Sequence, residues 1–366
     1  MVVLIYVIQE LSYSYEPKPE SESESEKYKL VSIGEVAINI HNVGVYFRNT
    51  FNPSQDYFNL ISNEHTFQTL TESKKPSDAY RTGIYLSEVE ALSFPENTSH
   101  NILSESETET KFKLLRCSSN LNGPTDNFRT TDKIIISQVN ETAKHYFEEK
   151  TTLNHVLAQI YQNKVVVSDD GKKTEKKAKI KDHSDKTKDM PRTGLIAFCT
   201  FYKNYSNKTF TDDSAHIKQS TSNIFDYCFR DQTVLTKLRF RLKKMVTDPT
   251  LTKQFDVTLY PNSVFIISLR TNRLYTHEIM PSSLSIDKIP TRLGYVIRCS
   301  KTDAVHINNQ TYIREGTTYT KLIEPDLESI KALKELYYKE NMTDELIHYD
   351  ALYFSMNDGD YKKPII

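Results

Sequence analysis

The sequence predicts an α+β protein whose later half is dominated by strands. Residues 195–202 and 263–269 are dense runs of β-branched and aromatic residues, and residues 235–245 alternate apolar with basic side chains. Helical spacing of apolar residues occurs mainly in the earlier half, at 54–70 and 137–148, and returns near the end at 327–338. At 366 residues the chain can form one large domain with insertions or two medium ones.

Net charge and cysteine content restrict the class of partner and compartment. The formal charge of −1 gives no overall basic field for nucleic acid, so such binding would need a local patch. The four cysteines form no CxxC pair, which predicts free thiols in a reducing compartment, cytoplasmic or nuclear. We expect no membrane partner, because the apolar start of the chain is short and lacks a basic region.

Four regions follow from the distribution of these patterns. Residues 1–27 join a short apolar strand or tail to the acidic repeat PKPESESESE, which has the composition of a solvated linker. Residues 28–150 should form an α/β extension that packs on the core, with strands over 29–47, a helix over 54–70 capped by Ser54, an acidic loop at 105–110 and a helix over 137–148. The core should span 151–320, and residues 321–366 should form a C-terminal helix and tail.

The core region reads as a succession of strands. A strand over 154–163 should lead into a hairpin over 164–181, with its turn at 169–171 and a strongly basic second arm. Further strands are expected at 195–202, 235–245, 255–260, 263–269 and 291–299, with a polar insertion near 204–230.

His183 and Asp185 are candidate metal ligands. Two residues apart in a strand, their side chains would lie on the same face. A histidine from another strand would complete two imidazoles and one carboxylate, which suits a non-haem Fe(II) with open positions. We expect His277 to be that ligand, with His216 as the competitor; zinc hydrolysis through the same ligands is the alternative chemistry.

Arg292 and Arg298 form a second candidate group. Their even separation places both on one face of a strand, opposite Leu293, Tyr295 and Ile297. Arginines that share a concave face would bind an anion, whereas on an exposed edge strand they would be ordinary surface cations.

These segments resemble a known family. Six segments are similar, in their order and in their residue types, to the AlkB-like 2-oxoglutarate/Fe(II) dioxygenases. They are residues 157–161, 183–186, 190–191, 195–201, 277–279 and 292–298. The spacing of the two arginines after the distal histidine is the most specific mark. The resemblance covers about 154–300 and implies a double-stranded β-helix (jelly-roll) core. The helical spacing described above places helices before and after this core.

The resemblance also implies roles for individual residues. His183, Asp185 and His277 would bind Fe(II). Arg292 would bind the distal carboxylate of 2-oxoglutarate and Arg298 would lie near its keto-acid end. The co-substrate would also contact Tyr161 and Gln159; the glutamine replaces the family's usual asparagine, and Gly294 and Val296 replace polar residues between the arginines.

The implied activity consumes 2-oxoglutarate and O2 and hydroxylates or oxidatively demethylates a substrate. One expectation is N-methylated nucleobases in DNA or RNA, with phosphates contacted by the basic arm Lys172–Lys181 and by a stripe made of Lys237, Arg239, Arg241, Lys243 and Lys244. Ordinary solvated strand faces explain both features equally well. The alternatives are a protein or small-molecule hydroxylase of the same superfamily, and a non-catalytic interaction protein with a relict site.

Overall fold

The computed structural model describes residues 5–8, 28–31, 36–70, 81–93, 108–118, 121–148, 151–203, 227–229 and 232–366. The acidic repeat, most of the predicted insertion at 204–230 and the competing ligand His216 lie outside the described residues. Within the described part, no helix has the length and apolar character that crossing a membrane requires.

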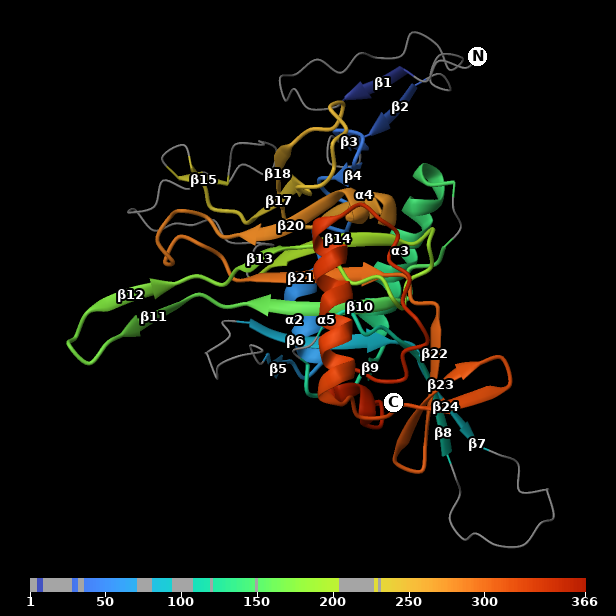
Figure 1. The fold of residues 1–366 in the computed structure, drawn as a ribbon. Helices are drawn as coiled ribbons and strands as arrows, with labels where there is room; N and C mark the ends of the chain where they lie inside the picture. Colours follow the sequence, from blue (N-terminus) through green and yellow to red (C-terminus); the bar gives the residue numbers. More distant parts are fainter. Residues whose placement is uncertain are drawn as a thin grey trace, which may run out of the picture.

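A large, mostly antiparallel sheet forms the centre of the molecule (Figure 1). Among the described residues it has nine strands, in the order β3-β4-β19-β14-β21-β10-β6-β5, with β9 paired to β6. Their bounds are β3 (Ile38–Ile40), β4 (Gly44–Phe47), β5 (Gln68–Thr69), β6 (Arg81–Ser87), β9 (Asp126–Asn127), β10 (His155–Tyr161), β14 (Leu195–Tyr202), β19 (Ser263–Ser268) and β21 (Arg292–Arg298). Strands from both halves of the chain therefore share one sheet, and the expected order of helices first and strands later is wrong.

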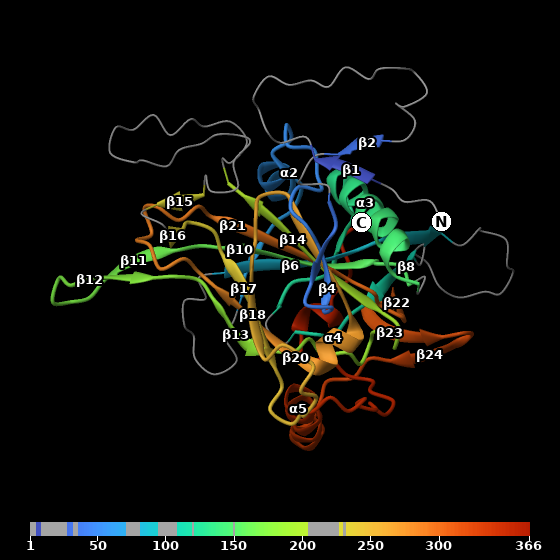
Figure 2. The ribbon, with the colours of Figure 1, turned by 90° about the horizontal axis from the view of Figure 1, so that it is seen from above.

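Two helices cover one face of this sheet, on the side opposite the C-terminal helix (Figure 2). They are α2 (Tyr57–Glu64) and α3 (Thr130–Tyr146). Helix α2 is shorter than predicted and is capped by Asp56, whose side chain accepts from the backbone N–H of Asn59, and not by Ser54. Helix α3 starts earlier than predicted. Its first turn is polar and therefore carries no apolar spacing that would indicate a helix, and the Asp132 carboxylate accepts from the backbone N–H of Arg129 there.

A second, smaller sheet packs against the opposite face. In the described chain it has four strands, ordered β13-β20-β17-β18, with bounds β13 (Ile180–His183), β17 (Lys237–Leu242), β18 (Gln254–Thr258) and β20 (Tyr275–Met280). Aromatic side chains fill the space between the sheets: Phe240 lies edge-on to Phe198 and Phe265, with ring centroids 6.5 and 5.6 Å away. The fold is mixed α and β with mostly antiparallel sheets, as a β-sandwich requires.

A third sheet was not foreseen from the sequence. In the described residues it has five strands, ordered β24-β23-β22-β8-β7, with bounds β7 (Val89–Ser93), β8 (Thr108–Leu114), β22 (Thr302–Ile307), β23 (Gln310–Glu315) and β24 (Thr318–Lys321). Residues from Thr108 onward, expected in an acidic loop, belong to β8, because their alternation continues into buried Phe112 and Leu114.

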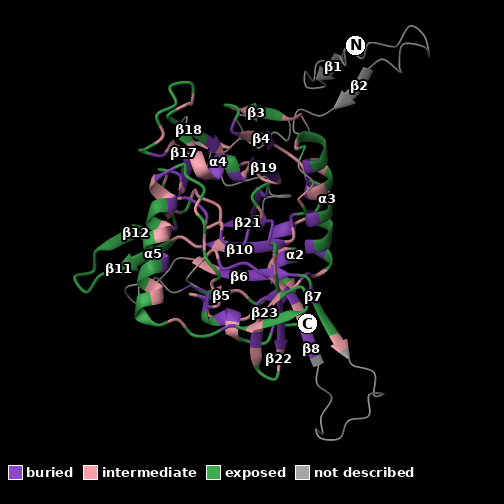
Figure 3. Ribbon diagram, turned by 45° about the vertical axis from the view of Figure 1, so that its right-hand side comes forward, coloured by how far each residue is buried: buried purple, intermediate pink, exposed green. Residues whose placement is uncertain are grey.

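Two features lie beside the smaller sheet. The predicted hairpin is present as β11 (Lys164–Val167) and β12 (Lys173–Lys176); every residue of both strands is exposed, and this hairpin arm projects from the body (Figure 3). Its second strand is shorter than predicted, because the chain from Ile180 onward pairs with β20 as β13. The C-terminal helix α5 (Leu327–Met342) is longer than predicted and crosses in front of the strands (Figure 1). The remaining elements are β1 (Ile5–Ile8) parallel to β2 (Tyr28–Val31), β15 (Cys228–Phe229) with β16 (Gln232–Thr233), the short helix α4 (Leu269–Leu274) and the 3₁₀ turn η2 (Asp358–Tyr361).

Candidate metal centre and anion pocket

His183, Asp185 and His277 converge at one point of the structure. His183 ends β13 and lies directly opposite His277 of β20, with ring centroids 4.6 Å apart. Asp185 lies beyond the end of β13, so the expectation that one strand holds both His183 and Asp185 is wrong. Nevertheless, one possible ligand atom from each residue lies within 4.8 Å of the others.

The surroundings of both imidazoles favour the neutral form, which is the form that binds a metal ion. Nδ1 of His183 is 2.8 Å from the carbonyl oxygen of Lys181, to which it donates, and this leaves Nε2 as the free acceptor, 3.9 Å from Oδ1 of Asp185. Burial lowers the pKa of His183. Burial, and then the neighbouring His183, lower the pKa of His277 to about 3.

The Asp185 carboxylate is held by Arg298. The Nε of Arg298 donates to Oδ2 at 2.8 Å and Nη2 donates to Oδ1 at 3.1 Å, with both side chains buried. Burial alone would raise the pKa of Asp185, but the charge and hydrogen bonds of Arg298 hold it well below its usual range. Each carboxylate oxygen keeps a second lone pair, so the same group can bind a metal ion.

Arg292 is a buried cation with no anion among the described residues. Its guanidinium lies over the Tyr161 ring, 3.9 Å from the centroid, and its Nε and Nη2 have no hydrogen-bond partner in the same part of the chain. Gly294 makes room for it, since a Cβ there would lie 2.8 Å from Nη1. Because burying a charge without a partner is costly, this group points to an anionic ligand.

A cavity of about 270 Å³ connects the arginines with the three candidate ligands. This volume is just below that of most small-molecule sites, roughly 300–1,000 Å³. Its lining includes every site residue predicted from the sequence: Gln159, Tyr161, His183, Asp185, His277, Arg292 and Arg298. The prediction that the two arginines share one face is confirmed, since Leu293, Tyr295 and Ile297 point into the opposite core. The hydroxyl of Tyr161 donates to Oε1 of Gln159 at 3.1 Å.

The predicted site omitted several side chains that surround Asp185. The carboxamide of Asn272 bonds to the backbone of Asp185, and Asn341 of α5 accepts from the backbone N–H of Ser184 at 2.8 Å. Tyr337 of α5 also lines the cavity. The sequence predicted an amphipathic helix at 327–338, but no pattern in it indicated that the last turn of this helix lies against the candidate metal centre.

A second cluster resembles a metal site but is an ion pair. Glu64, His65 and Asp132 lie within 4.8 Å of one another, yet both ring nitrogens of His65 bond to carboxylates, at 2.8 Å to Asp126 and 2.7 Å to Asp132. Burial alone would lower the pKa of His65, but these two carboxylates outweigh it and raise the pKa to about 9. The imidazolium therefore holds α2, β9 and α3 together, and Asp132 also accepts from the Tyr295 hydroxyl at 2.7 Å.

The basic stripe of β17 is largely neutralised. Arg239 donates to Asp256 at 2.7 Å, and Arg241 pairs with Glu278 at 2.6 Å. Lys243 is buried, and its ammonium donates to the backbone carbonyl of Glu340 at 2.6 Å. These contacts occupy three of the five basic side chains of the predicted phosphate-binding stripe.

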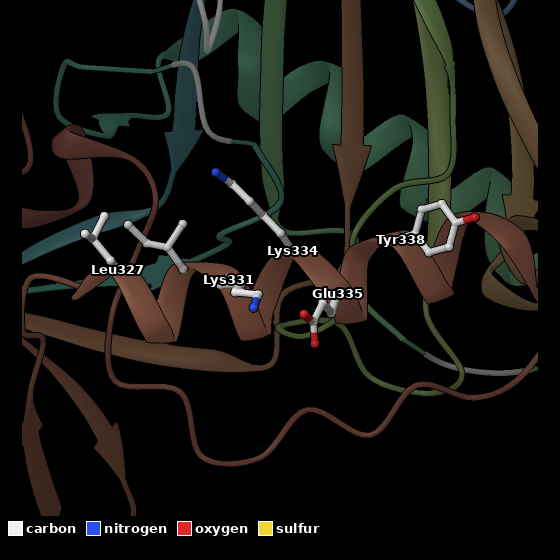
Figure 4. A pocket seen from close by; sticks show the side chains of 6 residues that line it. Leu327, Lys331, Lys334, Glu335 and Tyr338 are labelled. Carbon is white, nitrogen blue, oxygen red and sulfur yellow. The ribbon is translucent and has the colours of Figure 1, made fainter.

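A separate hollow of about 450 Å³ lies along the outer side of α5 (Figure 4). Its lining is Leu327, Ile330, Lys331, Lys334, Glu335 and Tyr338. None of these side chains is buried, so nothing here requires a ligand in the way that Arg292 does.

The likeness of this chain to known proteins lies in structure and not in sequence. No family model and no curated protein matches it. It is similar to a solved structure of a Pseudomonas putida prolyl-4-hydroxylase, with 9% sequence identity, coverage of 70% of this chain and 91% of that chain, and a TM-score of 0.32.

Proposed function

We propose that the chain is an Fe(II)- and 2-oxoglutarate-dependent oxygenase of the AlkB-like kind, built on a jelly-roll core. The order of the core strands supports this fold. Leaving out the two small hairpins, the strands from β10 to β21 can be numbered one to eight along the chain. They then run 1-8-3-6 in the large sheet and 2-7-4-5 in the small one. Two facing sheets interleaved in this way are the arrangement of a jelly roll.

The buried, unpaired guanidinium of Arg292 carries the functional proposal. It lines the same cavity as His183, Asp185 and His277. Zinc hydrolysis could use the same three ligands but has no need of a buried cation for a second anion. A co-substrate with two anionic ends accounts for both parts of the cavity, since one end can reach the metal while the other pairs with Arg292.

The donor set fits iron. The neutral imidazoles of His183 and His277 and the carboxylate of Asp185 would hold Fe(II) and leave positions open. With 2-oxoglutarate and O2, bound iron would supply the oxidation in which one oxygen atom enters a substrate C–H bond and the other enters succinate, with loss of CO2.

The chain's own residues would bind and orient these groups. Arg292 would pair with the distal carboxylate, supported from below by the Tyr161 ring, while the Tyr161 hydroxyl and Gln159 complete that end of the cavity. Arg298 would keep the Asp185 carboxylate ionised and oriented, and its buried Nη1, which has no partner among the described residues, faces the keto-acid end in this proposal.

For the substrate we propose an N-methylated nucleobase, with the arm as the phosphate-binding element. The hairpin β11–β12 follows Tyr161 of the large sheet and is followed by β13, which ends at His183. A polyanion bound to this hairpin would therefore lie beside the cavity. Lys172, Lys173 and Lys176 are exposed on it. A protein or small-molecule hydroxylase is the alternative, and it requires no contribution from these lysines.

Succinate formation tests the proposal. The full chain with Fe(II), ascorbate and 2-oxoglutarate should form succinate, and methylated oligonucleotides should increase the rate. His277→Ala should abolish iron binding, whereas Arg292→Ala should keep iron and require more 2-oxoglutarate. A wild-type protein that binds no iron and forms no succinate under any condition would exclude the oxygenase.

A further inference from the structure

Asn272 makes a reciprocal pair of hydrogen bonds to the backbone of Asp185. The Asp185 N–H donates to Oδ1 of Asn272 at 2.9 Å, and Nδ2 of Asn272 donates to the Asp185 carbonyl oxygen, also at 2.9 Å. Asp185 lies beyond the end of β13, where a strand partner would otherwise satisfy these groups. The carboxamide thus takes the place of a neighbouring strand.

We propose that Asn272 is a positioning residue that sets the place of Asp185 relative to His277. This inference rests on the proposed function, because it treats both residues as metal ligands. Asn272 lies on α4, the short helix that leads directly into β20 and His277. One carboxamide therefore joins the backbone of one ligand to the element that carries another.

Helix α4 is itself firmly held. The Thr271 hydroxyl donates to the carbonyl oxygen of Val43 at 2.6 Å, and the backbone N–H of Leu269 donates to the carbonyl oxygen of Gly194 at 3.0 Å. Asn272 is 1% exposed, and both polar atoms of its carboxamide bond to Asp185. The backbone of Asp185 is therefore hydrogen-bonded to a helix that is itself bonded to two other parts of the fold.

An amide is the side chain that this contact needs, because it supplies one donor and one acceptor. In Asn272→Asp the donor is lost, and a carboxylate faces the Asp185 carbonyl oxygen. In Asn272→Ser the side chain is too short to reach both groups. Either change leaves buried backbone groups without partners and lets the segment move, and losses in the supporting shell of a metal site typically cost about 10- to 100-fold in metal affinity.

The chain contains a matched control. Asn140 of α3 forms the same reciprocal pair with Leu153, at 2.9 Å for each bond. Helix α3 lies on the other side of the large sheet from the smaller sheet that carries His183 and His277. The changes Asn140→Asp and Asn140→Ser therefore remove the same two bonds without touching the candidate metal centre.

The test is titration of the metal-free full-length protein with Co(II), followed by its visible absorption and by calorimetry, together with the melting temperature of the metal-free form. We expect both Asn272 variants to raise the Co(II) Kd by about 10- to 100-fold and to alter the Co(II) spectrum. The Asn140 variants should have a Co(II) Kd within about twofold of wild type but a lower melting temperature. Should Asn272→Asp not fold, Asn272→Ser decides.

Two results separate the failure of this inference from the failure of the proposed function. If wild type binds Co(II) in a His277-dependent manner but Asn272→Ser binds it equally well, the positioning role is wrong and the proposed function stands. The positioning role is also wrong if Asn140→Ser weakens Co(II) binding as much as Asn272→Ser does. If wild type and His277→Ala bind Co(II) alike, the metal centre itself is wrong.

Discussion

Replacing Gly294 with alanine tests whether the pocket beside Arg292 is shaped for an anion. An alanine Cβ at this position would lie 2.8 Å from Nη1 and 3.2 Å from Nη2 of Arg292, and 3.2 Å from Cε2 of Tyr161. The guanidinium cannot stay where it is, because an ordinary contact begins near 3.4 Å. It must move by about 0.6 Å, and the Tyr161 ring beneath it limits the direction.

A movement of this size lengthens a charge-assisted hydrogen bond from about 2.8 Å to beyond 3.2 Å, outside its usual range. Such bonds contribute about 1.5–3 kcal/mol each, so losing one should raise the Kd for 2-oxoglutarate by about 10- to 100-fold. Calorimetry with Co(II)-loaded protein would measure this. Metal affinity and melting temperature should stay near wild type, because Gly294 contacts none of the candidate ligands and alanine is tolerated in a strand.

Arg292→Ala shows how much 2-oxoglutarate affinity is lost when the guanidinium is removed. Arg292→Lys keeps the charge but cannot form bidentate hydrogen bonds. Gly294→Ala should fall between wild type and Arg292→Ala. A Gly294→Ala protein that binds 2-oxoglutarate as tightly as wild type would refute the anion pocket, as would one in which Co(II) and 2-oxoglutarate binding weaken equally.

Three further changes test other parts of the structure. Asp185→Asn should abolish Co(II) binding and also destabilise the metal-free protein by about 3–5 kcal/mol in urea unfolding, because it leaves the buried Arg298 cation without its anion; unchanged stability would contradict the pairing. The pKa of His65 is raised from 6.5 to about 9, so its stabilising contribution is complete below pH 6.5 and is lost as the pH rises through 9. Urea unfolding across that range should therefore show a loss of stability in wild type that His65→Gln lacks. Reversing the charges of Lys172 and Lys173 should weaken oligonucleotide binding and reduce its salt dependence while leaving 2-oxoglutarate affinity unchanged; equal oligonucleotide binding would favour the protein or small-molecule alternative.

Local patterns in the sequence were sufficient to predict several elements and the faces of their residues. The strand predicted at 195–202 is β14, and the basic hairpin has its turn where 169–171 placed it. The even spacing of Arg292 and Arg298 placed both on the cavity side of β21, because side chains alternate along any strand. These features depend only on neighbouring residues.

Local patterns failed where a distant segment decides the outcome. Strand β22 pairs with β8, and β23 and β24 follow it, in a sheet that no periodicity indicated, since the alternation of these strands is short and polar. The segment between β19 and β20 is the helix α4, and its Asn272 contacts Asp185, which lies far away in the chain.

The sequence by itself determined which residue types were available and which side of each strand they face. Only the tertiary structure decided their partners. It paired Arg298 with Asp185, left Arg292 without an anion among the described residues, and brought α4 and α5 against the segment that carries Asp185. The physical reason is that alternation along a strand is set by the backbone over a few residues, whereas pairing, burial and charge depend on the path of the whole chain.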